Sequence, residues 1–298
     1  MKSQYEILII GGGTAGIMTA AQLLAKNKNI SIAIIEPANT HYYQPAWTLV
    51  GAGTYDYKKT AKPMAEVMPK GVDWIKDYAT GFDPENNAVS TKENGSITYD
   101  FLVVAPGLVM EPSLIEGLPE AFEKGIACSN YINPEHTWET LKNFKGGNAL
   151  FTQPTTPIKC GGAPQKIAYL AADYFRKNGL QDKTNVIFAT PGSVIFGVKP
   201  VKETLMKVID RYGIHFKPFY APYRIDVDNK IAHFNHTAPE ENRCVINEGN
   251  ELGEKMTGDV DIEIPFDMLH IAPPQAAPKF IRDSVLVNDA GWLDVDHH

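Results

Sequence analysis

The sequence is poor in cysteine, has no long apolar run and carries no excess of positive charge. Its 298 residues contain three cysteines, an odd and sparse set that does not fit the disulfide framework of a secreted domain. No apolar run reaches the roughly 20 residues that a membrane-spanning helix needs. The balance of 28 basic against 35 acidic residues argues against nucleic-acid binding. An apolar strand begins close to the N-terminus, so we expect no signal peptide and a cytoplasmic protein.

A glycine-rich turn joins an apolar run to a helix-forming stretch near the N-terminus. Residues 7–10 are apolar, the turn reads Gly-x-Gly-x-x-Gly, and a second apolar run ends at Glu36, 20 residues after the last glycine. This spacing is typical of a dinucleotide site with its pyrophosphate at the helix N-terminus and its ribose at the acid. The alternative is a tight strand–helix turn without a ligand. The cofactor contacts predicted here are Gly11, Gly13, Thr14, Ala15, Gly16 and Glu36.

Five further segments of the first half of the chain have recognisable patterns. Residues 41–53 form an aromatic loop that either contacts a ligand or packs as an ordinary loop, and residues 60–69 favour a short helix. Residues 72–75 and 88–91 favour strands of a meander. The apolar strand 101–105 ends in Pro106-Gly107, which resembles the Ala-Thr-Gly ending of flavoprotein disulfide reductases, with proline replacing threonine. Pro106 and Gly107 are therefore expected to contact the cofactor.

A second α/β unit begins near residue 148. Strands are predicted at 149–152, 185–190 and 214–218, with helices at 163–177 and 199–212, and a polar hairpin follows. We predict an α/β fold with tandem Rossmann-like dinucleotide-binding domains of the flavoprotein disulfide-reductase type. The predicted FAD-binding domain covers residues 1–111, with 266–298 returning to it, and the second domain covers 112–265.

The second unit lacks a phosphate-binding glycine turn. The segment after its first strand, residues 153–164, is long for a Rossmann turn and contains prolines that remove N–H donors. No acid follows the next strand at 190–192. We therefore expect that this unit does not bind NADH or NADPH.

Cys160 is the candidate nucleophile in that segment. It precedes the predicted helix N-terminus, and Lys159 and Lys166 are near in sequence, an environment that lowers a thiol pKa. The alternative is a buried structural cysteine. No metal site is predicted.

Several motifs resemble those of sulfide:quinone oxidoreductases, in particular the mitochondrial type and its bacterial relatives. They include the glycine fingerprint and, further on, residues 41–45 (HYYQP), 157–166 (PIKCGGAPQK), 195–198 (IFGV), 268–274 (MLHIAPP) and 290–296 (AGWLDVD). The resemblance implies FAD and a redox-active cysteine pair, with Cys160 as its first member. Sulfide would attack the oxidised pair to leave a persulfide, two electrons would pass through the flavin to a quinone, and the sulfur would go to an acceptor.

The resemblance also implies polypeptide beyond His298, with a second redox cysteine, a flavin-contacting turn and membrane-anchoring helices. The intact enzyme is thus expected to be peripheral at a membrane surface, and this chain alone is expected to turn over little or not at all. Apolar surface around 268–281 is expected to be exposed. A homo-oligomer is one possible state.

Other interpretations stay open. A type II NADH:quinone dehydrogenase-like flavoprotein is the enzyme alternative, and an inactive flavin-binding fragment is the other. Cys128 is either a third sulfur-handling thiol, and so a second candidate catalytic residue, or a core filler. Cys244, in a polar hairpin, is interpreted as structural or incidental.

Overall fold

The chain forms two compact units, described here one by one. The computed structural model describes residues 2–240 and 250–296, so Cys244 lies outside the described residues. Unit 1 consists of Met1–Tyr43, Lys58–Val109 and Ala276–His298, and unit 2 consists of Gln44–Tyr57 and Met110–Gln275. The main boundary lies close to the predicted one at 111/112. Residues 44–57 and 266–275 differ from the prediction, since both fall in unit 2.

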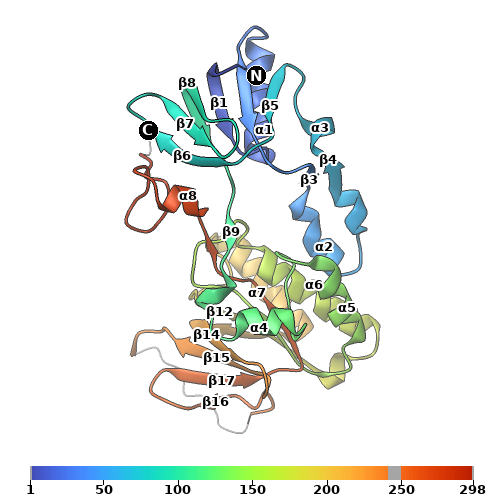
Figure 1. Cartoon of the computed structure of the whole chain (residues 1–298). Helices are drawn as coiled ribbons and strands as arrows, with labels where there is room; N and C mark the ends of the chain where they lie inside the picture. The colour runs from blue at the N-terminus through green and yellow to red at the C-terminus, as the bar shows by residue number, and fades with distance from the viewer. Residues whose placement is uncertain (1, 241–249, 297–298) are drawn as a thin grey trace. The chain divides into compact units, whose positions relative to one another are not determined.

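Unit 1 is built on a six-stranded sheet with the order β5-β2-β1-β8-β7-β6 (Figure 1). β1 is central and runs parallel to β2 and β8, and α1 connects β1 to β2. Alternate β1 and β2 side chains enter two separate apolar clusters, and the one that includes Ile9 and Ile34 packs against α1 residues Ala20 and Leu23. The elements are β1 (Gln4–Ile10), α1 (Thr14–Lys26), β2 (Ile32–Ile35), β5 (Val72–Ile75), β6 (Ala79–Asp83), β7 (Ala88–Thr91) and β8 (Ser96–Val104).

Two local predictions in unit 1 were wrong. The strand at 72–75 is not part of a meander, because β5 pairs in parallel with β2 and extends the Rossmann sheet, while the antiparallel meander is formed by β6, β7 and β8. The predicted helix at 60–69 is mostly other structure: η2 (Tyr57–Thr60), β4 (Ala61–Pro63) and the short α3 (Met64–Val67). β4 pairs with β3 (Thr40–Tyr42), so tertiary pairing overrides local helix propensity here.

Unit 2 contains a parallel sheet with the order β10-β18-β11-β12-β13. Its strands are β10 (Ala127–Cys128), β11 (Gly147–Thr152), β12 (Thr184–Thr190), β13 (His215–Pro218) and β18 (Met268–Ile271). Helices α5 (Pro134–Asn143), α6 (Ala163–Lys177) and α7 (Lys199–Tyr212) contribute to its apolar cluster through Leu141, Ile167 and Ile209. The predicted helices and strands of this unit are confirmed within one or two residues.

A four-stranded antiparallel sheet completes unit 2 and is visible at the bottom of Figure 1. Its strands are β14 (Tyr220–Asp226), β15 (Ile231–His236), β16 (Lys255–Met256) and β17 (Asp261–Pro265). The shorter elements of the chain are η1 (Gln44–Ala46), α2 (Trp47–Gly51), β9 (Val109–Met110), η3 (Pro112–Leu114), α4 (Leu118–Glu123), η4 (Gln181–Lys183), β19 (Gln275–Ala276) and α8 (Lys279–Arg282).

The expectation of exposed apolar surface around 268–281 was wrong. β18 is inserted between β10 and β11, and residues 268–275 are all buried. Within unit 1, Ala277 and Ile281 are also buried, and Phe280 stacks on Phe82 of β6 with ring centroids 5.7 Å apart. Residues 268–275 therefore belong to the core of unit 2, and Ala277 and Ile281 belong to the core of unit 1.

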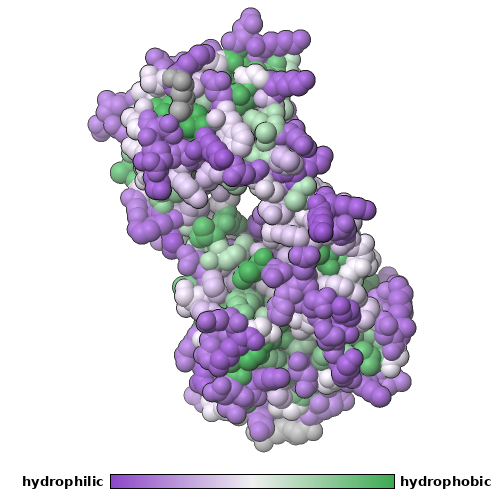
Figure 2. Space-filling view, turned by 45° about the vertical axis from the view of Figure 1, so that its right-hand side comes forward, coloured by the Kyte–Doolittle hydropathy of each residue, from purple (hydrophilic) through white to green (hydrophobic). Residues whose placement is uncertain are grey.

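Most of the face drawn in Figure 2 is covered by hydrophilic residues, and its apolar patches are small and separate. Among the described residues, no helix combines the length and the apolar character that crossing a membrane requires.

Candidate functional site

Gly11 and Gly16 are required by the packing of the β1–α1 turn. Gly11 has a φ of +100°, and a Cβ there would lie 2.1 Å from the Ala105 carbonyl oxygen. A Cβ on Gly16 would lie 2.0 Å from the Gly11 carbonyl oxygen. These contacts fix the turn against the end of β8, where the Ala105 N–H donates to the Ile10 carbonyl at 2.8 Å.

Gly13 has a different environment. It is the N-cap of α1 with φ −75°, a conformation that any residue adopts, and a Cβ there would meet no atom within 4 Å. No side chain caps the helix, and its first turn contains no acidic residue. The first N–H groups of a helix have no partner within the helix, and Thr14 and Ala15 of this first turn are exposed, so the positive end of α1 lies at the surface. This arrangement suits a phosphate.

Glu36 lies directly beside this turn. Its Oε2 accepts from the Gly12 N–H at 2.7 Å, and its Oε1 accepts from the Ala38 N–H at 2.7 Å. Each carboxylate oxygen has further accepting capacity, which the hydroxyls of a ribose can use. Pro106 also borders the turn, since its Cα would lie 2.9 Å from a Cβ on Gly11. Gly107 has a φ of +77° and open space around it. These residues fit the adenosine diphosphate portion of a dinucleotide.

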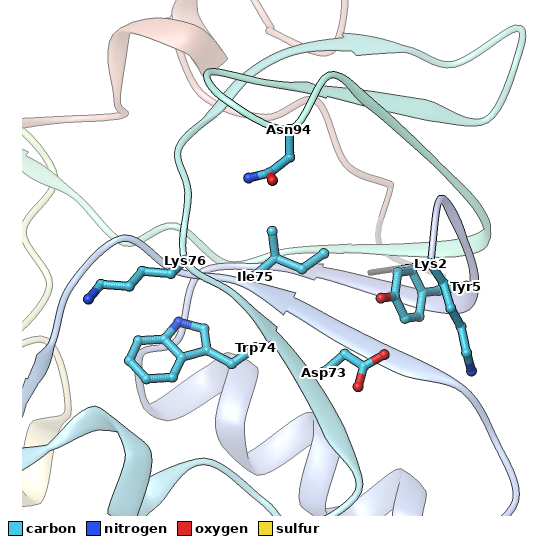
Figure 3. A pocket seen from close by; sticks show the side chains of 7 residues that line it. All are labelled: Lys2, Tyr5, Asp73, Trp74, Ile75, Lys76 and Asn94. Atoms are coloured by element: carbon cyan, nitrogen blue, oxygen red, sulfur yellow. The ribbon is translucent and has the colours of Figure 1, made fainter.

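A cavity of unit 1 lies on β5, the strand next to Glu36. It has a volume of about 720 Å³, and Figure 3 shows the side chains that line it. Trp74 connects it to Glu36, because the indole Nε1–H donates to the Glu36 carbonyl at 2.8 Å. The lining contains no glycine-turn residue and no cysteine, so we do not assign it to the candidate site. The lining residues are Lys2, Tyr5, Asp73, Trp74, Ile75, Lys76 and Asn94.

Cys160 lies in unit 2 on residues 153–162, which connect β11 to α6 and form the cysteine segment. α6 begins at Ala163, has Gly162 as N-cap without a side-chain cap, and carries Pro164 in its first turn. The Cys160 side chain is exposed, and its Sγ lies 3.8 Å from Lys166 Nζ. The predicted neighbourhood of thiol, helix N-terminus and Lys166 is therefore present.

Lys159 has other direct partners than the Cys160 sulfur. Its Nζ donates to Gln44 Oε1 and lies 5.8 Å from the centre of the Tyr131 ring. Desolvation lowers the pKa of the Lys159 ammonium, and the charge of Cys160 acts in the opposite direction. Gln44 belongs to the predicted loop 41–53, which forms β3, η1 and α2 and contacts the cysteine segment through this side chain.

Cys128 has an environment opposite to that of Cys160. It is fully buried in β10, and desolvation raises its thiol pKa to about 12. Its neighbour across the strand pair is His270 of β18, whose pKa burial lowers to about 3 and whose ring stacks on Phe151 at 5.7 Å. At neutral pH both side chains are uncharged components of the core.

Two residues that sequence reasoning missed hold the cysteine segment. The Tyr131 hydroxyl donates to the Cys160 carbonyl, and the Gln275 side chain accepts from the Lys159 N–H. Neither residue lies in a chemical motif that would indicate this contact. Across residues 2–240 and 250–296, no group of three or more His, Cys, Asp or Glu side chains is arranged to hold a metal ion.

The parallel sheets, the glycine turn and the exposed cysteine define a flavoprotein oxidoreductase fold. The chain belongs to the pyridine nucleotide-disulphide oxidoreductase family, whose sequence model matches residues 5–230.

Within that family the chain is similar to mitochondrial sulfide:quinone oxidoreductases. It is 38% identical to the mouse protein and 39% identical to the Dictyostelium discoideum protein, in each case over 99% of this chain and 62% of the relative. The solved Aquifex aeolicus sulfide:quinone oxidoreductase has the same fold, with a TM-score of 0.76 and 21% identity, covering 97% of this chain and 63% of that one. The chain thus spans less than two thirds of the length of these relatives.

FAD is the cofactor of this family, as the sequence predicted. The open space at Gly13 and the carboxylate of Glu36 fit it, whereas the residues that contact it stay a proposal.

Proposed function

We propose that this chain is part of a sulfide:quinone oxidoreductase, which oxidises sulfide and passes two electrons to a quinone. The observation that carries the proposal is the cysteine segment. An exposed thiol beside a lysine stands where a second Rossmann unit would otherwise hold its phosphate loop. Similarity to sulfide:quinone oxidoreductases over 99% of the chain supports the assignment.

In this proposal unit 1 holds FAD. The α1 N-terminus binds the pyrophosphate over Gly11, Gly13 and Gly16, Thr14 and Ala15 supply N–H donors, and Glu36 binds the ribose. Pro106 and Gly107 border the same turn. When bound, FAD accepts two electrons from sulfur and delivers them to the quinone. The protein's part is to retain the cofactor through backbone donors and one carboxylate.

Cys160 is the proposed sulfur carrier. A thiolate at Sγ attacks a sulfane sulfur, one S–S bond breaks as a new one forms, and hydrosulfide or a shortened polysulfide leaves with the electron pair. Attack by sulfide on a disulfide that includes Cys160 gives the same persulfide and frees the second thiolate. Lys166, 3.8 Å from Sγ, stabilises negative charge on the thiolate and on the persulfide. Cys128, with its raised pKa, is proposed as a packing residue.

The cysteine segment also argues against NADH as the electron donor, the proposal's main alternative. Pro154 and Pro157 offer no backbone N–H donor. Ten residues separate the end of β11 at Thr152 from the start of α6 at Ala163, which is longer than a Rossmann turn. Residues 190–192, at the end of β12 and just after it, include no carboxylate for a ribose. A type II NADH:quinone dehydrogenase needs both features.

The partners of the reaction are proposals of the same kind. Sulfide, a quinone and a sulfur acceptor are its substrates, and quinones are dissolved in membranes. We therefore propose that the natural gene product, meaning the polypeptide as its gene encodes it, associates peripherally with the cytoplasmic side of a membrane. Sedimentation with quinone-containing liposomes tests this association.

Anaerobic flavin reduction tests the function. The natural gene product, loaded with FAD, should lose its flavin absorption on mixing with sulfide and keep it on mixing with NADH or NADPH. Cys160→Ser should abolish the response to sulfide, and Cys244→Ser, which changes a cysteine that has no role in the proposal, should not. Rapid bleaching by NADH, or bleaching by sulfide in Cys160→Ser, would refute the proposal.

A further inference from the structure

Two buried side chains from distant parts of unit 2 hold the backbone on either side of Cys160. The Tyr131 hydroxyl donates to the Cys160 carbonyl oxygen at 2.9 Å. Gln275 Oε1 accepts from the Lys159 N–H at 3.0 Å. Tyr131 is 8% exposed and Gln275 is 1% exposed, so the side-chain partner of each hydrogen bond is buried. The reactive side chain is exposed, whereas its anchors belong to the core.

The anchors themselves are fixed. Tyr131 packs in an apolar cluster with Ala163 and Ala272, and its N–H donates to Ser129 Oγ at 3.2 Å. The Gln275 N–H donates to Thr156 Oγ1 at 2.9 Å, a second tie between the same residue and the cysteine segment. A segment without regular secondary structure is thereby attached to buried residues before and after the cysteine.

The Tyr131 hydroxyl is suited to a permanent donor role. Burial raises its pKa, and the neighbouring Cys160 raises it further, so the phenol keeps its proton at any working pH. The Cys160 carbonyl also accepts from the Ala163 N–H at 3.1 Å. This carbonyl is therefore held by the start of α6 and by Tyr131 together.

The position of the Cys160 backbone determines the distance between its sulfur atom and Lys166. Sγ lies 3.8 Å from Lys166 Nζ, and Lys166 is on α6, whereas Cys160 is on the segment before it. A small rotation of the Cys160 backbone would separate the two side chains. We propose that Tyr131 and Gln275 are positioning residues that hold Cys160 in the orientation in which its sulfur meets Lys166. The inference rests on the proposed function only in naming sulfide as the source of the incoming sulfur.

Alkylation of Cys160 tests this without requiring turnover. The fully reduced natural gene product with FAD bound is treated with iodoacetamide at pH 7, and labelling of the Cys160 peptide is followed by mass spectrometry. Tyr131→Phe and Gln275→Met should each slow labelling by about 2- to 10-fold, the effect of losing one hydrogen bond. Tyr212→Phe is the matched control. It removes a hydroxyl of α7 that donates to Asp173 Oδ1 of α6 at 3.1 Å, a contact that involves no residue of 153–166, and it should leave the rate unchanged.

A double-mutant cycle separates positioning from general loosening. If Tyr131 acts by holding Sγ against Lys166, Tyr131→Phe should have little further effect in a Lys166→Met background, so the two effects should not add. Additive effects, or an unchanged rate in both Tyr131→Phe and Gln275→Met, would overturn the inference. Thermal unfolding identifies a variant that has lost its fold, and the other variant then decides.

Steady-state kinetics distinguish this inference from the proposed function. If the natural gene product oxidises sulfide, Tyr131→Phe should lower kcat and leave the KM for quinone unchanged. Slower alkylation in a protein that never oxidises sulfide would refute the proposed function and retain the positioning role. If the natural gene product oxidises sulfide, and Tyr131→Phe changes neither the alkylation rate nor kcat, the proposed function is retained and the positioning role is refuted.

Discussion

Replacing Gly13 by alanine should weaken FAD binding strongly while leaving the fold intact. The other two glycines of the turn cannot make this separation, because a Cβ on Gly11 or Gly16 would lie about 2 Å from a carbonyl oxygen. Gly13 has an ordinary φ of −75°, and no atom lies within 4 Å of the position that an alanine methyl would take. The space that the methyl would occupy is the space that the pyrophosphate needs.

Two opposing contributions set the effect of Gly13→Ala on the free energy of unfolding. Alanine is a poorer N-cap than glycine by up to about 1 kcal/mol. It also reduces the entropy of the unfolded chain, which stabilises the fold by about 0.4–1 kcal/mol. The free energy of unfolding without FAD should therefore change by less than about 1 kcal/mol. A methyl that displaces the phosphates would cost one or two charge-assisted hydrogen bonds, about 2–5 kcal/mol, which weakens FAD binding roughly 30- to 4,000-fold.

The assay measures FAD binding to the apoprotein by flavin fluorescence quenching, together with chemical denaturation. Gly81→Ala in β6 is the matched control, since its Cβ also meets no atom within 4 Å and lies outside the turn. Gly16→Ala should instead lower stability by about 1–3 kcal/mol through overpacking. Unchanged FAD affinity in Gly13→Ala would refute the placement of the pyrophosphate.

Three other predictions follow from buried groups. Burial acts to raise the pKa of Asp77, but hydrogen bonds, two of them from Asn94, outweigh it and lower the pKa to about 2. Asp77→Asn should therefore cost up to about 2 kcal/mol at pH 7 and about half of that at pH 3, because the contribution is lost as the pH falls through the folded pKa. An equal loss at both pH values in chemical denaturation would argue against this. Cys128, with its pKa of about 12, should resist alkylation until the protein is unfolded, and rapid labelling at pH 7 would contradict its burial. Glu254 is 1% exposed and pairs with Lys217 at 2.6 Å, so Glu254→Ala should destabilise unit 2 by about 3 kcal/mol. An unchanged melting temperature would show that this pair is unimportant.

Local patterns were sufficient to predict the helices and strands on which the proposed site residues lie. The glycine turn, the helix after it and Glu36 follow one another within the first 36 residues, so their contacts are set by a single β–α–β unit. Likewise, Cys160 and Lys166 lie six residues apart around one helix N-terminus. In such cases the backbone geometry of the element brings the side chains together.

Long-range pairing could not be predicted in this way. The strand at 72–75 pairs in parallel with β2, and β18 inserts between β10 and β11, although nothing in either short apolar run specifies its neighbours. Tyr131 and Gln275 reach the cysteine segment across 29 and 116 positions of sequence. Lys159 was expected to favour the thiolate, and its charge interacts with Cys160, but its contact with Gln44 was not predicted. Each of these outcomes depends on tertiary contacts.

The most direct test of the central claim is to locate the sulfur on the protein. The FAD-loaded, reduced natural gene product is mixed anaerobically with inorganic polysulfide, a donor of sulfane sulfur, alkylated, digested and examined by mass spectrometry. The account predicts one or more extra sulfur atoms on the Cys160 peptide, and less of this product in Lys166→Met. Extra sulfur mainly on Cys128 or Cys244, or spread evenly over the three cysteines, would contradict it.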